Sequence, residues 1–154
     1  MVHGLVGVAV LDAFAGSGAL GLEALSRGAG DALFVERDRR SVVALERNIA
    51  ELGLDGVARV LVGDVKKLAE TGAIPAGAFS LLFLDPPYRI DRSEVRGVIE
   101  ALASSGALAE GALIVWEHST TDQPEWPERV EPVSERRYGS TTVSIGELGG
   151  VETG

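Results

Sequence analysis

The amino-acid sequence predicts an α/β fold in which a mostly parallel sheet has helices on both faces. Short apolar runs alternate with longer segments whose apolar residues recur at helical spacing. A glycine-rich turn joins the first apolar run to the first helical segment. Strands and helices that alternate in this way are typical of sheets built from parallel crossover units.

The expected elements follow from apolar periodicity and from turn residues. The expected strands span 7–12, 31–36, 57–63, 79–84 and 111–117, and the expected helices span 18–27, 39–52, 65–71 and 92–104. Gly53 provides a stop for the second helix. Residues 121–127 are expected to form a loop. Two last strands, 130–137 and 141–147, form a predicted hairpin that turns at Tyr138-Gly139-Ser140.

Composition indicates a small enzyme with one core. With 154 residues, 45% of them hydrophobic, the chain suits a single domain over 1–154, and we expect the glycine-rich tail 149–154 to be disordered. The absence of cysteine excludes disulfides, thiolate zinc sites and thiol catalysis. Asp12 and four glycines interrupt the apolar stretch 5–22, which makes it a poor membrane span. We expect a cytoplasmic monomer without a bound metal.

The glycine-rich turn predicts a nucleotide-like cofactor. Gly16, Gly18 and Gly21 satisfy the G-x-G-x-x-G pattern, which lets a nucleotide approach the backbone at a helix N-terminus. Glu36 ends the second strand, where an acidic residue is placed to bind ribose hydroxyls. A dinucleotide and S-adenosylmethionine both fit this much.

Asp12 and Asp64 favour S-adenosylmethionine. A carboxylate just before the glycine turn would repel a pyrophosphate but attract a sulfonium and an ammonium group. Asp64 follows the third strand, where it can accept the adenine amino group. The alternative for Asp12 is a cap or turn acid, and for Asp64 the N-cap of the helix that begins near Lys66.

The tetrapeptide Asp85-Pro86-Pro87-Tyr88 follows the fourth strand and predicts the catalytic group. The two prolines end the strand, because they donate no backbone hydrogen bond. The Asp85 carboxylate and the Pro86 carbonyl can accept the N–H bonds of an exocyclic amine, while Tyr88 stacks on the ring that carries it. The alternative is a simple turn with Tyr88 half-buried.

Four acidic residues thus end four successive strands, and in an open parallel sheet such residues lie along one edge, where ligands bind. The predicted cofactor site consists of Asp12, Phe14, Gly16, Ser17, Gly18, Glu36, Arg37, Asp64, Val65 and Asp85. The predicted catalytic residues are Asp85, Pro86 and Tyr88.

The net charge of −9 is unusual for a nucleic-acid-binding protein, because phosphate contacts normally require a basic surface. Basic residues are local instead: Arg89, Arg92 and Arg96 follow the catalytic turn, and Arg136-Arg137 precede Tyr138. The alternative for these groups is a solvated helix face or a charged edge strand.

The order of Asp-Ala-Phe-Ala-Gly-Ser-Gly (12–18), Val-Glu-Arg-Asp (35–38), Gly-Asp-Val (63–65) and Asp-Pro-Pro-Tyr (85–88) resembles S-adenosylmethionine-dependent amino methyltransferases. The stretches 18–29 and Arg137-Tyr138-Gly139 are similar to the RsmD type, the 16S ribosomal RNA guanine-N2 methyltransferases. This resemblance implies a Rossmann-like sheet of order 3-2-1-4-5-7-6, S-adenosylmethionine as cofactor, and ribosomal RNA or a small-subunit assembly particle as partner. The predicted RNA-binding residues are Arg89, Arg136, Arg137 and Tyr138. They follow from the local positive charge, and the resemblance at Arg137-Tyr138-Gly139 supports those of the hairpin.

Members of that family carry an N-terminal arm with a basic hairpin and a helix that covers the cofactor. We expect this chain to lack the arm, since it opens at Met1-Val2-His3-Gly4 just before the first strand. Three other functions remain open: methylation of adenine N6 or another amine, a nicotinamide-dependent oxidoreductase, and a non-catalytic remnant that binds cofactor only.

Overall fold

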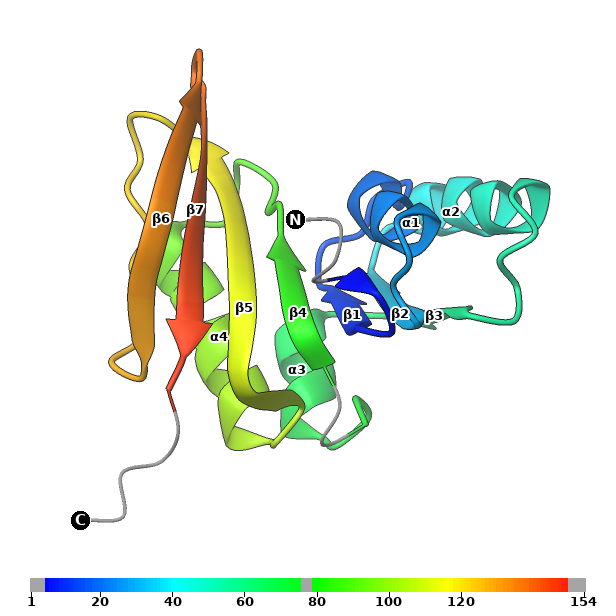
Figure 1. Cartoon of the computed structure of the whole chain (residues 1–154), viewed down its shortest axis with the longest axis horizontal. Helices are drawn as coiled ribbons and strands as arrows, with labels where there is room; N and C mark the ends of the chain where they lie inside the picture. The colour runs from blue at the N-terminus through cyan, green and yellow to red at the C-terminus, as the bar shows by residue number, and fades with distance from the viewer. Residues whose placement is uncertain (1–4, 76–78, 150–154) are drawn as a thin grey trace.

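The computed structural model describes residues 5–75 and 79–149, which fold around one seven-stranded sheet. In chain order the elements are β1 (Ala9–Asp12), α1 (Ala19–Ser26), β2 (Asp31–Glu36), α2 (Arg39–Glu51), β3 (Ala58–Val62), α3 (Val65–Glu70), β4 (Phe79–Leu84), α4 (Arg92–Ser104), β5 (Leu108–Ser119), β6 (Val130–Tyr138) and β7 (Thr141–Leu148). The strand order is β3-β2-β1-β4-β5-β7-β6 (Figure 1). The first five strands in this order pair in parallel, and β7 pairs antiparallel with β5 and β6. The predicted fold class and strand order are confirmed.

Alternating strand residues build two cores, one on each face of the sheet. Leu11 and Val35 belong to the cluster that contains residues of α3 and α4. Their neighbours Val10 and Phe34 belong to the cluster that contains residues of α1 and α2. Successive side chains of a strand point to opposite faces, so the helix pairs lie on opposite sides of the sheet (Figure 1).

The helices begin at aspartate N-caps wherever the sequence offers one. The carboxylates of Asp38, Asp64 and Asp91 accept backbone N–H groups in the first turns of α2, α3 and α4. Gly53 follows α2 with φ 68°, a left-handed conformation suited to glycine, so the predicted stop is confirmed. The observed helix bounds lie within one residue of the predicted ones.

The predicted fifth strand was too short. β5 begins at Leu108, three residues before the predicted start, because the register shifts and Gly111 at φ 80° lets the strand continue. It ends at Ser119 rather than 117, since the polar residues at its end still pair with β7. The hairpin turn is also shorter than predicted: Tyr138 pairs with Thr141, which leaves a loop of Gly139 and Ser140.

The predicted disordered tail was wrong at its first residue. Gly149 N–H donates to the Arg129 carbonyl at 2.8 Å, and Arg129 Nη2 donates to the Gly149 carbonyl at 3.2 Å. The remaining tail, 150–154, lies outside the described residues. Within residues 5–75 and 79–149, no helix is long and apolar enough to cross a membrane.

Candidate active site

A cavity of about 1020 Å³ lies at the carboxyl ends of the parallel strands. The four acidic strand-end residues that the sequence predicts to meet there all line it: Asp12, Glu36, Asp64 and Asp85. It is also lined by other predicted site residues, namely Phe14, Gly16, Ser17, Arg37, Val65, Pro86, Tyr88 and Arg89. Four predicted residues lie outside this lining: Gly18, Arg136, Arg137 and Tyr138. Most of the predicted site, contributed by separate segments, therefore surrounds one space.

Asp12 is a buried carboxyl group at the end of β1, with 1% of its surface exposed. Its Oδ2 accepts the N–H of Gly21 in the first turn of α1 at 3.1 Å, while Oδ1 has no hydrogen-bond partner among the described residues. Burial raises the pKa of Asp12 to about 7, opposed by the Gly21 hydrogen bond and reinforced by the charges of Asp85 and Glu36. Asp12 therefore does act as a turn acid, the alternative role, through Oδ2. Its buried Oδ1 still lacks a hydrogen-bond donor among the described residues.

Glu36 fixes the glycine-rich turn. Its Oε1 accepts the N–H of Gly16 at 2.8 Å, and its Oε2 accepts the N–H of Asp38 at 2.7 Å. Gly16 has φ 57°, so the turn requires glycine for its backbone conformation. Each carboxylate oxygen keeps a second lone pair, which leaves Glu36 able to accept from a ribose hydroxyl.

Gly18 serves the packing of α1 rather than the wall of the cavity. It is the left-handed N-cap of α1, at φ 91°. A Cβ at this position would lie 2.3 Å from Cδ1 of Leu45 on α2. The third glycine of the pattern, Gly21, is equally close-packed, because a Cβ there would lie 2.3 Å from the ring of Phe34. Two of the three glycines thus let α1 approach its neighbours.

Asp64 caps a helix and also lines the cavity. Its Oδ1 accepts the N–H groups of Lys66 at 2.9 Å and of Lys67 at 3.4 Å, so it is the N-cap of α3. It also lines the cavity, as does the buried Val65 that follows it. Its Oδ2 makes no hydrogen bond within the part of the chain that the structure describes, and is therefore available to a ligand.

The segment Asp85-Pro86-Pro87-Tyr88 leaves β4 at the edge of the cavity. Ile90 N–H donates to the Pro87 carbonyl at 3.0 Å and closes the turn. Partial burial raises the pKa of the Asp85 carboxyl. The Tyr88 side chain is 102% exposed, so the alternative of a half-buried packing residue is wrong. An aromatic ring is thus held in solvent beside a carboxylate that can accept hydrogen bonds.

The β6–β7 hairpin brings basic residues toward the same edge of the sheet. Ser140 and Thr141 at its tip line the cavity, while Arg136, Arg137 and Tyr138 are exposed on the edge strand β6. Arg137 Nε donates to the Gly139 carbonyl at 3.2 Å. Because successive residues of a strand point to opposite faces, Arg136 and Arg137 face opposite sides.

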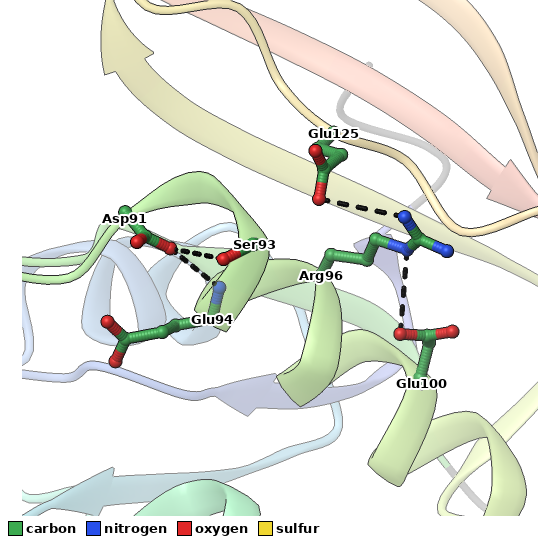
Figure 2. Close-up of polar contacts among 6 residues, drawn as sticks. All are labelled: Asp91, Ser93, Glu94, Arg96, Glu100 and Glu125. Atoms are coloured by element: carbon green, nitrogen blue, oxygen red, sulfur yellow. Dashed lines mark hydrogen bonds and ion pairs between the residues drawn. The ribbon is translucent and has the colours of Figure 1, made fainter.

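Arg96 forms ion pairs with two carboxylates. Figure 2 shows its guanidinium between Glu100 of α4 and Glu125 of the loop before β6, at 3.5 Å and 3.6 Å. The same view shows the N-cap of α4, where Asp91 accepts from the Ser93 hydroxyl at 2.6 Å and from the Glu94 N–H at 3.0 Å (Figure 2). These ion pairs favour the alternative of a solvated helix face for Arg96.

Residues 1–147 match the family described as Conserved hypothetical protein 95. The putative rRNA methyltransferase YlbH of Bacillus subtilis (strain 168) is 36% identical over 138 residues, which cover 88% of this chain and 73% of that protein. The ribosomal RNA small subunit methyltransferase D of Escherichia coli (strain K12) is 41% identical over 110 residues. The chain belongs to this family, the RsmD-type methyltransferases.

The family resemblance predicted from the motifs is thereby confirmed, and S-adenosylmethionine is the cofactor of such methyltransferases. A solved structure described as a putative methyltransferase yhhF from Escherichia coli superimposes with a TM-score of 0.82 at 34% identity, covering 94% of this chain and 78% of that chain. The match to the Escherichia coli methyltransferase D covers 71% of this chain but only 52% of that relative, about half its length.

Sequence reasoning missed the part of the RsmD-type site that comes from the end of β5. The cavity lining also includes Trp116, Glu117, His118 and Ser119. Burial, together with the charge of Asp85, raises the pKa of Glu117. The signal in the sequence was that Glu117 is an acidic residue at the end of the predicted strand 111–117. No role was predicted for this residue.

Proposed function

We propose that this chain transfers a methyl group from S-adenosylmethionine to the exocyclic N2 of a guanine in 16S ribosomal RNA. The observation that carries the proposal is the position of Asp85-Pro86-Pro87-Tyr88 at the edge of a cavity that Asp12 also lines. The Oδ1 of Asp12 has no hydrogen-bond partner within residues 5–75 and 79–149. A carboxylate, a proline carbonyl and an exposed ring are the groups that a planar base with an amine requires. The names of the relatives support ribosomal RNA as the substrate class. Ribosomal RNA is a cytoplasmic substrate, so the proposed site of action is the cytoplasm.

The cavity fits a cofactor with cationic groups. Its lining carries eight acidic residues, Asp12, Glu36, Asp38, Asp64, Asp85, Glu94, Glu117 and Asp122, but four basic ones, Arg37, Lys66, Arg89 and Arg92. This excess of negative charge disfavours a pyrophosphate and therefore a nicotinamide dinucleotide. The buried Oδ1 of Asp12 finds no hydrogen-bond partner in the described part of the chain, and a cationic ligand group would provide one. Glu36 and Asp64 stand at the neighbouring strand ends to accept ribose hydroxyls and the adenine amino group.

The side chains around β4 would prepare the amine. S-adenosylmethionine supplies an electrophilic methyl group on a positively charged sulfur. Asp85 and the Pro86 carbonyl accept the two N–H bonds of the amine, which favours a more tetrahedral nitrogen with its lone pair directed at the methyl carbon. Holding the reactants in line provides much of the acceleration. As the new N–C bond forms, the bond between the methyl carbon and the sulfur would break and a neutral thioether would leave. The amine would lose one proton, and Asp85 is the base placed to accept it.

Tyr88 would provide the stacking surface for a base that is unpaired or flipped out of its helix. Stacking of a base on an aromatic side chain contributes about 1–3 kcal/mol. We expect Tyr88→Ala to lower RNA use about tenfold or more, whereas Tyr88→Phe retains the ring and has a milder effect. If both variants lowered the rate of RNA methylation equally in steady-state kinetics, the hydroxyl of Tyr88 rather than its ring would be the functional group.

The proposal is tested by methyl transfer from labelled S-adenosylmethionine to naked 16S ribosomal RNA and to small-subunit particles. Mass analysis of digested RNA should show N2-methylguanosine. N6-methyladenosine as the product would support the adenine alternative, which uses the same catalytic turn. Calorimetric binding of S-adenosylhomocysteine without any transfer would show the non-catalytic remnant. Comparison of RNA and particle also establishes whether the partner is the free RNA or the assembling subunit.

A further inference from the structure

Glu117 of β5 lies next to Asp85, the residue that follows the last residue of β4. Leu84 pairs in parallel with Trp116, so Asp85 and Glu117 are the next residues of two adjacent strands. Leu84 and Trp116 are both buried in the core shared with α3 and α4. Glu117 continues β5 and therefore points to the face opposite Trp116, while Asp85 leaves the end of β4 beside it. That face is also the one on which Asp12 contacts α1, and all three carboxyl groups line the same cavity.

These carboxyl groups lack cationic partners. The ion pairs among the described residues use Glu23, Glu100 and Glu125, and none uses Asp12, Asp85 or Glu117. Burial, and then the charge of Asp85, raises the pKa of Glu117. Asp12 adds an independent sign of a missing ligand, since its Oδ1 is fully buried without a hydrogen bond. Two adjacent carboxylates that repel each other are stabilised by a ligand that offers several N–H donors.

Guanine offers such donors on one edge. Its ring N1–H and its exocyclic N2 amine are neighbours, whereas N1 of adenine is an acceptor and would be repelled by a carboxylate. Adjacent strands lie about 4.8 Å apart, so their side chains can converge on neighbouring atoms of one ring. With the target amine at Asp85, the second carboxylate stands where the ring nitrogen would lie.

We propose that Glu117 selects guanine by accepting its N1–H while Asp85 accepts an N–H of the N2 amine. The inference rests on the proposed function and deepens it, since it names the residue that separates guanine from adenine. It assigns Glu117 a contact with the substrate and leaves the cofactor to the strand ends of β1, β2 and β3.

The test compares binding of guanosine and 2-aminopurine riboside to the chain saturated with S-adenosylhomocysteine. The two bases share the exocyclic amine at C2, but N1 of 2-aminopurine carries no hydrogen. We expect the wild type to prefer guanosine about tenfold or more above neutral pH, the range for a hydrogen bond to a charged group. Glu117→Gln should bring this ratio close to one, because the amide can donate its own N–H to the bare N1.

The matched control is Glu110→Gln, the same change at an exposed position of β5 outside the cavity lining. It should keep the wild-type ratio, and both variants should bind S-adenosylhomocysteine with wild-type affinity. A wild type without preference for guanosine, or Glu117→Gln with an unchanged ratio, overturns the inference. Failure of the proposed function is detected in the methyl-transfer assay, as transfer to adenine or as no transfer. The binding ratio is measured without that assay, so the two failures are distinguishable.

Discussion

The two halves of the cavity hold their carboxylates in different ways. On the side of β1, β2 and β3, strand-end acids accept backbone N–H groups: Asp12 binds Gly21, Glu36 binds Gly16 and Asp38, and Asp64 caps α3. On the side of β4 and β5, the carboxylates of Asp85 and Glu117 make no hydrogen bond to the described residues. The first half is preorganised by the fold, and the second is left to be completed by a substrate.

This difference predicts which property, catalysis or cofactor binding, a variant in each half should lose. Variants of Asp85 and Glu117 should lose methyl transfer and retain the fold, because these side chains bind no partner among the residues that the structure describes. Variants in the β1–β3 half should weaken the cofactor site and the glycine turn together.

Asp85→Ala should lower methyl transfer about a hundredfold or more, since it removes the acceptor of the amine and a base within reach of its proton. The variant should still bind the cofactor in calorimetry, because Asp12, Glu36 and Asp64 remain. Its midpoint of denaturant unfolding should not fall below that of the wild type. Asp55→Ala, at an exposed turn before β3, is the control and should change neither quantity. Loss of cofactor binding in Asp85→Ala would erase the proposed division between the halves.

Glu36→Ala should weaken cofactor affinity about tenfold to a hundredfold, the equivalent of about 1.5–3 kcal/mol for hydrogen bonds to a charged group. The variant loses the ribose acceptor and also frees the N–H of Gly16 and of Asp38. Calorimetry with S-adenosylhomocysteine measures the effect, with Glu46→Ala on the exposed side of α2 as control. Unchanged affinity would show that this carboxylate serves the turn alone.

Asp12 should make cofactor binding depend on pH. Its pKa is raised from 3.8 to about 7, so its contribution to stability is complete below 3.8 and is lost as the pH rises toward 7. A cationic ligand favours the ionised form, and its affinity should therefore rise with pH up to about 7, by at most about tenfold per unit. Asp12→Asn should flatten both dependences, as followed by calorimetry and by urea unfolding. Parallel curves for wild type and variant would contradict this role.

The smallest effect is expected at the hairpin. Arg136 and Arg137 were predicted to bind RNA together, but they face opposite sides of β6. We therefore expect only one of the single variants, Arg136→Gln or Arg137→Gln, to flatten the salt dependence of RNA binding, by a log–log slope of about one. Cofactor affinity should stay constant in both. If neither variant changes the slope, the charges serve only to protect the edge strand.

Local signals in the sequence determined most of the fold. Apolar periodicity located every helix and strand, Gly53 ended α2, and acidic residues at four strand ends marked the edge where the cavity lies. These signals are local, because each depends only on residues that are close together in the sequence. The strand order came from the family resemblance instead, because nothing in the spacing of the motifs specifies which strands become neighbours.

The tertiary structure alone decided which partner each side chain meets. The bonds from Asp12 to Gly21 and from Glu36 to Gly16 join residues that lie 9 and 20 positions apart. Glu117 gained its place beside Asp85 only when β5 paired with β4. The sequence could name the acidic strand ends, but burial and neighbouring charge, which set their pKa values, arise only when distant strands pack into one sheet.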